Sequence, residues 1–309
     1  RNYSLSNTYV GGIVGVTGAG ITISYCDNVK TAATNSGIVR FEAATAPTST
    51  STSTLLYTDI YVGGILGGTT HAVTIDHCTN SGYIYGGSST NQINQYFYLG
   101  GIAGLLNNGG AKVTNCTETG ETYNDTASNK TVIDKTPLNG GIVGYALGTA
   151  ESNVEISNCK VNSDAILRTR RGALGGILGS GQYVSITECE VTPNLTGSGY
   201  YYGGIAGWVN NATITGCTYN GASLTASRGH NMGGIVGILG AGSTADACYS
   251  YVGTITPNDS YSSNVGAIAG TSEDGTFIKN CHYKSTLSVC GDTNFSDNSE
   301  ANVADLADL

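Results

Sequence analysis

The sequence predicts an all-β protein, a parallel β-helix (β-solenoid) of about eight turns with variable loop insertions. Three observations support this fold class. A five-residue glycine motif recurs eight times, a cysteine follows each copy 14 to 19 residues after its first glycine, and a short strand-like segment precedes each cysteine. Repeats this short cannot bury their own apolar side chains, so they stack and bury them between neighbours.

The motif combines two glycines, an isoleucine, a small or aliphatic residue and a third glycine, with alanine at the second position of the last copy. Its copies begin at Gly11, Gly63, Gly100, Gly140, Gly175, Gly203, Gly233 and Gly266. Equivalent residues of stacked strands lie about 4.8 Å apart, so the isoleucines are expected to form one core ladder. This ladder consists of Ile13, Ile65, Ile102, Ile142, Ile177, Ile205, Ile235 and Ile268.

Apolar residues also flank the motif at positions that, in a straight strand, would face the opposite side from the motif isoleucine. Examples are Val62 and Leu66, and Leu99 and Ala103. Two explanations remain open: a bend lies inside the motif, or an outer strip of small and apolar groups is covered. We favour the bend, because glycine permits tight bends and close backbone approach.

The segment before each cysteine alternates apolar and polar residues, as in VTIDHC from Val73 and ATITGC from Ala212. This period of two predicts a strand with its aliphatic residues inside. The cysteine breaks the alternation, so we predict a bend just before it, with the cysteine turned inward. The resulting cysteine ladder is Cys26, Cys78, Cys116, Cys159, Cys189, Cys217, Cys248 and Cys281.

The glycine motif, followed about fifteen residues later by I-x-N-C or T-I-x-x-C, resembles the GLUG-motif repeats of large secreted and surface proteins. Those proteins are mostly bacterial and include adhesin-like members. The resemblance covers essentially residues 9–290. It implies a parallel β-helix on an extracellular or cell-surface protein, and it implies no catalytic residues, since these repeats are a scaffold.

We expect one β-solenoid domain over residues 1–290, because no charged or Pro/Ser-rich linker separates the repeats. The repeats start near residues 9, 61, 98, 138, 173, 201, 231 and 264. The low-complexity segment from Thr45 to Tyr57 is expected to be an exposed loop. Residues 291–309 are expected to form a polar C-terminal tail or a partial cap.

Charged residues make up 11% of the chain and the net charge is −9. This balance offers little attraction for nucleic acid, and we expect the basic cluster at Arg168, Arg170 and Arg171 to be a solvated loop. No stretch is apolar enough for membrane insertion. Without an initiator methionine or signal peptide, the chain is expected to be a processed product or a fragment.

Nine cysteines allow two arrangements. Either they form an interior ladder of small apolar thiols, or vertical neighbours are bridged, since the stacking distance falls within the usual Cα range of disulfides. The odd total leaves at least one thiol unpaired within the chain. We favour buried thiols, with Cys281 and Cys290 as the best candidate disulfide.

Sequons for N-glycosylation are frequent, although a chain rich in Asn, Ser and Thr produces several by chance. The candidate glycosylation sites are Asn2, Asn115, Asn124, Asn129, Asn194, Asn211, Asn258 and Asn294. In a eukaryotic source they would indicate a glycosylated surface.

Catalysis on polysaccharides by a β-helix requires clustered carboxylates in one groove. The outward Asp76 and Asp246 are about five turns apart, so we expect no enzyme and no catalytic residue. His71, His77 and Cys78 lie close in sequence but are expected to be structural, so we predict no metal and no cofactor. A polysaccharide-active enzyme remains a minor alternative.

Tyrosine gives the better indication of binding, because its apolar face and hydroxyl suit contact with carbohydrate or protein. The chain has 20 tyrosines, and many lie beside the glycine motif or in variable segments: Tyr9, Tyr57, Tyr61, Tyr96, Tyr98, Tyr200, Tyr201 and Tyr202. The alternative is aromatic stacking that only stiffens the coil.

The sequence shows no clear capping element, and an uncapped strand edge invites another chain to add on. We therefore expect a non-enzymatic extracellular structural or adhesive protein, as the head-to-tail subunit of a surface filament. The alternative is a segment of a larger cell-surface adhesin that binds host or cell-surface glycans or proteins.

Overall fold

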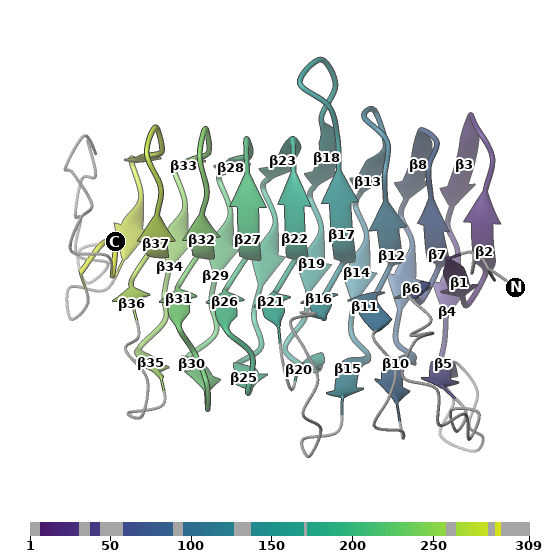
Figure 1. Ribbon diagram of the computed structural model, residues 1–309, viewed down its shortest axis with the longest axis horizontal. Coiled ribbons are helices and arrows are strands. Elements are labelled where there is room, and N and C mark those ends of the chain that lie inside the picture. The colour runs from purple at the N-terminus through teal and green to yellow at the C-terminus, as the bar shows by residue number, and fades with distance from the viewer. Residues whose placement is uncertain are drawn as a thin grey trace, which may run out of the picture.

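The computed structural model describes residues 7–30, 38–43, 58–88, 95–126, 137–169, 172–257, 264–283 and 288–291. These residues form a column of 39 strands in five parallel sheets, with successive turns side by side along the long axis (Figure 1). Each of the first seven turns contributes one strand to each of sheets A to E in that order, and the described part of the eighth turn contributes to sheets A to D. The predicted fold class, an all-β parallel β-solenoid of about eight turns, is confirmed.

Sheet A holds the strands that end on the first glycine of each motif, so the motif marks the same point of every turn. They are β1 (Thr8–Gly11), β6 (Thr58–Gly63), β11 (Gln95–Gly100), β16 (Leu138–Gly140), β21 (Ala173–Gly175), β26 (Tyr201–Gly203), β31 (Asn231–Gly233) and β36 (Asn264–Gly266).

Sheet B holds the strands that begin at the fourth motif residue. They are β2 (Val14–Thr17), β7 (Leu66–Thr69), β12 (Ala103–Leu106), β17 (Val143–Leu147), β22 (Leu178–Gln182), β27 (Ala206–Asn210), β32 (Val236–Leu239) and β37 (Ala269–Ser272). The second glycine and the isoleucine therefore form a bend between sheets A and B. This is the bend inside the motif that the sequence analysis favoured.

In the first seven turns this bend leaves no room for a side chain at the second motif position, whereas in the eighth turn Ala267 occupies it. A Cβ on Gly64 would overlap the carbonyl oxygen of Gly101 in the next turn, and a Cβ on Gly63 would overlap the carbonyl oxygen of Leu66. The amides of Ile65 and Leu66 both donate to the carbonyl of Ile102, at 3.0 and 2.9 Å. The glycines are thus required for close backbone approach between turns rather than for a positive φ angle.

Sheet C holds the segments before the cysteines, and their alternation is as expected: the aliphatic residue in the middle points inward and its neighbours point outward. The strands are β3 (Ile21–Ser24), β8 (Val73–Asp76), β13 (Lys112–Thr114), β18 (Val154–Ser157), β23 (Val184–Thr187), β28 (Thr213–Thr215), β33 (Thr244–Asp246) and β38 (Phe277–Lys279).

A sharp bend separates sheet C from sheet D, because the residue before each cysteine has a left-handed backbone. These residues and their φ angles are Tyr25 (53°), His77 (50°), Asn115 (53°), Asn158 (52°), Glu188 (52°), Gly216 (63°), Ala247 (51°) and Asn280 (48°). Only one is glycine, but asparagine, which tolerates this conformation better than most residues, occurs three times. The bend therefore lies where the sequence predicts it.

Sheet D consists of two-residue strands after the cysteines: β4 (Asp27–Asn28), β9 (Thr79–Asn80), β14 (Thr117–Glu118), β19 (Lys160–Val161), β24 (Glu190–Val191), β29 (Thr218–Tyr219), β34 (Tyr249–Ser250) and β39 (His282–Tyr283). The second residue of each strand points into the column.

Sheet E has seven strands: β5 (Ile38–Ala43), β10 (Tyr83–Ser88), β15 (Glu121–Thr126), β20 (Ile166–Thr169), β25 (Leu195–Gly197), β30 (Ser223–Ala226) and β35 (Thr254–Thr256). The variable lengths between repeats fall mainly between sheet E and the next strand of sheet A. The predicted loop from Thr45 to Tyr57 and the tail at 292–309 lie outside the described residues.

Seven residues of the predicted isoleucine ladder, from Ile65 to Ile268, are fully buried. Ile13 differs: its side chain is 48% exposed, although its amide keeps the ladder bond to the carbonyl of Ile65. The expectation of a core position was wrong for Ile13, because its turn has a described neighbour on one side only.

Residues Ser288–Gly291 add part of a ninth turn that the sequence analysis missed. The amides of Ile268 and Ala269 both donate to the carbonyl of Val289, so Val289 takes the isoleucine position of a degenerate motif. Cys290 then pairs with Ala269 of sheet B. Nothing in a search for the glycine pair could find this copy, because serine stands where the second glycine belongs.

Candidate functional site

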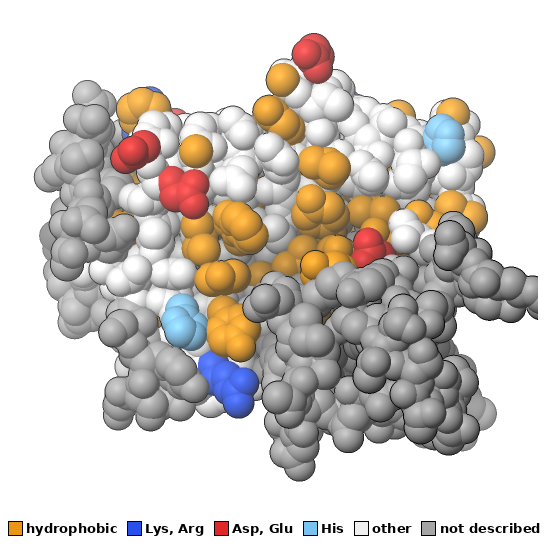
Figure 2. All heavy atoms as spheres, viewed as in Figure 1, with side chains coloured by type: hydrophobic (Ala, Val, Ile, Leu, Met, Phe, Trp, Pro, Cys, Tyr) orange, Lys and Arg blue, Asp and Glu red, His pale blue; other side chains and the backbone are white. Residues whose placement is uncertain are grey.

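The outer faces of sheets A and B form a groove beside the glycine bend. A Cβ on Gly67 of sheet B would reach the backbone nitrogen of Val10 in the preceding turn of sheet A, so the two faces pack closely. Figure 2 shows hydrophobic side chains gathered across the middle of this face. We define the aromatic groove by the rings on its two sides: Tyr9, Tyr61, Tyr96, Tyr98 and Tyr201 from sheet A, with Tyr145 and Trp208 from sheet B.

In the first four turns these rings stack on one another. The centroids of Tyr9 and Tyr61 are 5.1 Å apart, those of Tyr61 and Tyr98 are 4.7 Å apart, and their planes are nearly parallel. Tyr145 continues the row from sheet B, with its centroid 5.5 Å from Tyr98. Such spacing is typical of favourable aromatic pairs, so this part of the groove is already filled by its own side chains.

The row is interrupted in the fifth turn, where a hollow of about 420 Å³ opens. Ser180 of β22 lies in register between Tyr145 of β17 and Trp208 of β27, and it has no ring. The wall beyond it is Trp208, whose ring packs against Tyr201 at 6.0 Å between centroids. The lining residues are Tyr96, Tyr98, Leu138, Tyr145, Ser180, Gly181, Gln182, Tyr201, Trp208 and Asn210.

The lining residues that the structure describes carry no formal charge. Burial raises the pKa of both Tyr98 and Tyr145, so their hydroxyls remain neutral donors at physiological pH. The amides of Gln182 and Asn210 stand in register on adjacent strands at the edge of the hollow. The site therefore combines aromatic faces with neutral hydroxyl and amide groups.

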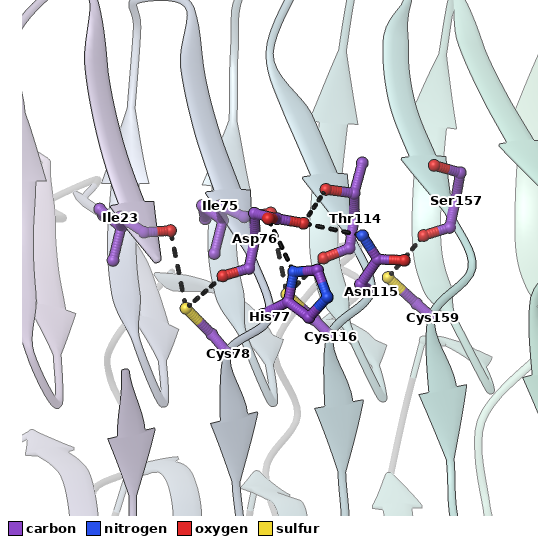
Figure 3. A network of polar contacts seen from close by, with 10 residues as sticks. All are labelled: Ile23, Ile75, Asp76, His77, Cys78, Thr114, Asn115, Cys116, Ser157 and Cys159. Atoms are coloured by element: carbon purple, nitrogen blue, oxygen red, sulfur yellow. Dashed lines mark hydrogen bonds and ion pairs between the residues drawn. The ribbon is translucent and has the colours of Figure 1, made fainter. Parts of the chain in front are cut away.

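A second polar cluster lies on the outside of sheet C, at the bend of turns two and three (Figure 3). Asp76 accepts hydrogen bonds from Thr114 Oγ1 at 2.6 Å and Asn115 Nδ2 at 2.9 Å, and its carboxylate lies 2.7 Å from His77 Nδ1. These bonds, led by that from Thr114, lower the pKa of Asp76 to about 2. Tyr25 stacks on His77 with ring centroids 5.0 Å apart. The cluster links adjacent turns, and its carboxylate is committed to protein donors.

The cysteine ladder lines the inner side of the same bend. Each thiol from Cys26 to Cys248 donates toward the carbonyl oxygen two residues earlier, as Cys116 does to Thr114 at 3.2 Å. From Cys78 onward the sulfur also lies near a carbonyl oxygen of the preceding turn, 3.6 Å for Cys78 and Ile23 (Figure 3). Burial raises the pKa of the Cys217 thiol. From Cys78 to Cys281 these side chains are buried in the main core, where they pack as small apolar groups.

All nine cysteines lie in the described part of the chain, and none forms a disulfide. The candidate pair of Cys281 and Cys290 was wrong. Cys281 stands at the bend between sheets C and D, whereas Cys290 stacks on Ala269 of sheet B and its thiol points toward Gly270 O at 3.9 Å. The two residues occupy different corners of the turn.

A buried polar ladder crosses the interior of the first three turns. Asn28 Nδ2 donates to Asn80 Oδ1 at 2.7 Å, and Asn80 Nδ2 donates to Glu118 Oε2 at 2.8 Å. The amide of Gly120 donates to Glu118 Oε1 at 2.8 Å. Glu118 is fully buried, and burial raises its pKa to about 8. The first turns also contain a smaller apolar cluster around Ile60, Ile84 and Phe97, distinct from the main core.

Among the predicted glycosylation sites, Asn115 and Asn211 lie at left-handed bends, and Asn194 Oδ1 accepts the amide of Ser223 at 2.9 Å. Asn124 lies on β15, and its side chain is not described. Four further sites lie outside the described residues: Asn2, Asn129, Asn258 and Asn294.

Other predicted features are dispersed. Arg168 is exposed on β20, while Arg170 and Arg171 lie outside the described residues. His71 and His77 are on different strand ends, and the described residues include no group of three metal-ligating side chains. Within the same described ranges, no helix has the length and apolarity needed to cross a bilayer.

Comparison with family models, with curated proteins and with solved structures gave no match. The parallel β-solenoid repeat architecture is therefore established by the structure itself, from the register of its five sheets.

Five of the seven groove rings, all from sheet A, are among the tyrosines predicted from the sequence, whereas Tyr145 and Trp208 are not. The predicted tyrosines also include Tyr202, which is fully buried in the core and whose hydroxyl accepts the amide of Gly199 at 2.7 Å. Tyr57 lies outside the described residues, and Tyr200 packs against His230 with centroids 5.3 Å apart. An alignment of the residue that directly follows each motif could have found Tyr145 and Trp208.

Proposed function

We propose that this chain is a non-enzymatic, extracellular adhesive column that binds carbohydrate in its aromatic groove. The observation that carries the proposal is the hollow of about 420 Å³ between the rings of Tyr145 and Trp208. Sugars present an apolar face of C–H groups, which packs on aromatic rings, and hydroxyls, which pair with amides and hydroxyls. The groove offers both kinds of group.

The uncharged lining supports binding rather than catalysis. Hydrolysis of a glycosidic bond uses a pair of carboxyl groups beside the scissile bond. The residues around the hollow contain tyrosine, tryptophan, serine and amide side chains instead. A polysaccharide-active enzyme is therefore the weaker candidate.

The extracellular location and the relationship to GLUG-motif adhesins are parts of the same proposal. Their support is the glycine motif itself, whose eight copies all form the bend between sheets A and B. A column of stacked turns that presents a lateral groove suits a surface-displayed binder of glycans, whether it acts alone or as a segment of a larger adhesin.

A glycan array probed with the labelled chain tests this function. We expect binding to a restricted set of glycans, and Trp208→Ala should weaken it at least tenfold, about 1.4 kcal/mol, since an aromatic contact is worth about that much. Tyr25→Ala is the matched control, because Tyr25 is highly exposed but lies on the sheet C bend. No binding to any glycan, or equal losses in both variants, contradicts the proposal.

End-to-end association is a second candidate, supported by the first turn. Large apolar side chains are exposed there, including Ile13, Val16 (59%), Ile21 and Val29. Another turn stacked on this end, from a second copy of the chain, would cover them and pair the open strand edges. Negative-stain microscopy over a range of protein concentrations should show filaments that Ile21→Lys shortens. Short rods alone, at every concentration, contradict filament assembly.

A further inference from the structure

The fifth turn lacks a ring at a position where both neighbouring turns have one. Tyr145, Ser180 and Trp208 are register partners on β17, β22 and β27, and all three point into the groove. We call the ring-free position of Ser180 the vacant rung, and we propose that it is a subsite for one neutral pyranose ring, held between Tyr145 and Trp208. The inference rests on the proposed carbohydrate function and specifies its site and its chemical class.

The spacing of the rungs fits one ring. Tyr145 and Trp208 stand on strands two spacings apart, about 9.6 Å at the usual distance between strands. A saturated ring in contact with an aromatic side chain on each face needs about 4 Å on each side, or about 8 Å in all. Two stacked sugar rings would need about 12 Å. The rung therefore accepts a single residue of a glycan, with the rest of the glycan along the groove.

Polar groups at the edge of the rung suit sugar hydroxyls. Gln182 and Asn210 are register partners, half-buried, and each side-chain amide offers both donors and an acceptor. The Ser180 hydroxyl lies on the floor between the two rings. A sugar in the slot could thus exchange its water hydrogen bonds for bonds to neutral groups at its rim.

The charges favour a neutral sugar over an acidic one. Among the described residues, the lining includes no lysine or arginine, so a carboxylate or sulfate would meet no counter-ion from them when it is desolvated. On the side of the groove toward the first turn, the Asp59 carboxylate accepts a hydrogen bond from Tyr61 at 3.3 Å, and Tyr61 stacks on Tyr98 of the lining. That carboxylate adds a repulsion for anions.

The fluorescence of Trp208 provides a direct assay, because it is the single tryptophan of the chain. The full chain is titrated with neutral cello-, xylo- and manno-oligosaccharides and with acidic oligogalacturonate. We expect a saturable change with at least one neutral series and at least tenfold weaker binding of the acidic one. Preference for oligogalacturonate overturns the proposed chemical class.

The variant Ser180→Tyr fills the vacant rung. It should fold, because both register partners already carry aromatic rings, and it should weaken neutral-sugar binding at least tenfold. Val16→Tyr is the matched control: it adds a ring at the same row position in the first turn, outside the hollow, and should bind like the wild type. Gln182→Ala adds no bulk and should also weaken binding several-fold. A loss of binding in this variant therefore cannot be explained by misfolding around an added ring.

The outcomes separate the inference from the function on which it rests. If glycans bind the chain on the array but Ser180→Tyr retains full affinity, the vacant rung is not the subsite, while the carbohydrate function stands. If neither the array nor the titration detects any glycan, both are wrong. Loss of binding in Ser180→Tyr and Gln182→Ala, with full binding in Val16→Tyr, supports the subsite.

Discussion

At the scale of single residues, the bend before each cysteine depends on a left-handed backbone that most side chains disfavour. Asparagine or glycine occupies this position in half of the turns, whereas Tyr25, His77, Glu188 and Ala247 adopt it with an ordinary side chain. The stacked strands on either side impose the conformation, at a cost of about 1 kcal/mol for each such residue.

A matched pair of substitutions measures this cost. Ala247→Gly should stabilise the protein by about 1 kcal/mol, because glycine adopts φ near 51° without strain. Gly216→Ala, at the same position one turn earlier, should destabilise it by a similar amount. A Cβ on Gly216 would meet only ordinary contacts, so the effect isolates backbone strain. Urea unfolding measures both, and shifts of the same sign contradict the account.

Glu118 predicts a pH dependence of stability. Its pKa is about 8 in the folded protein, against an ordinary value of 4.5. Because the folded value is raised, the contribution of the protonated form is complete below pH 4.5 and is lost as the pH rises through 8. The free energy of unfolding should fall across this window, by at most about 1.4 kcal/mol per pH unit.

Glu118→Gln tests this prediction, because glutamine cannot ionise. Urea unfolding between about pH 5 and pH 9 should show a clearly smaller slope for this variant than for the wild type, whatever its absolute stability. Equal slopes in the two proteins would show that another group dominates the pH dependence.

At the scale of elements, the glycine motif brings the backbones of adjacent turns into close contact at the bend between sheets A and B. Gly176→Ala should destabilise the protein by about 2 kcal/mol or more, since its Cβ would overlap the carbonyl oxygen of Gly204. Gly18→Ala is the control, because a Cβ there meets nothing within 4 Å. Thermal unfolding compares them, and a tolerated Gly176→Ala contradicts the close approach.

The repeating elements were predictable from the sequence because the residues that define each element lie close together within a single turn. The glycine bend, the inward row of sheet C and the bend before Cys78 all follow from local periodicity. The ninth motif at Ser288–Gly291 was not predictable, because only its hydrogen bonds to Ile268 and Ala269 identify it. The groove was predicted in part: its tyrosines were named, but the pairing of Tyr98 with Tyr145 depends on how sheets A and B meet.

At the scale of the whole molecule, each turn contacts its neighbours in register, so the column should tolerate removal of one turn. Deletion of residues 176–203 joins Gly175 to Gly204, which follows its register partner Gly203. We expect a folded, shorter solenoid by circular dichroism. It should lose sugar binding, because Tyr145 and Trp208 would become adjacent rungs about 4.8 Å apart.

Deletion of residues 234–266 is the control for this prediction. It joins Gly233 to Ala267 and removes a turn on the far side of Trp208 from the hollow. This protein should fold and keep sugar binding. If both shortened chains unfold, the turns are not the independent stacking units that the register implies.

A crystal structure of the chain grown with the tightest-binding neutral oligosaccharide tests the central claim most directly. The account predicts electron density for one sugar ring above Ser180, with Tyr145 and Trp208 on its two faces and the amides of Gln182 and Asn210 at its rim. A sugar bound elsewhere on the column, with this rung empty, would contradict it.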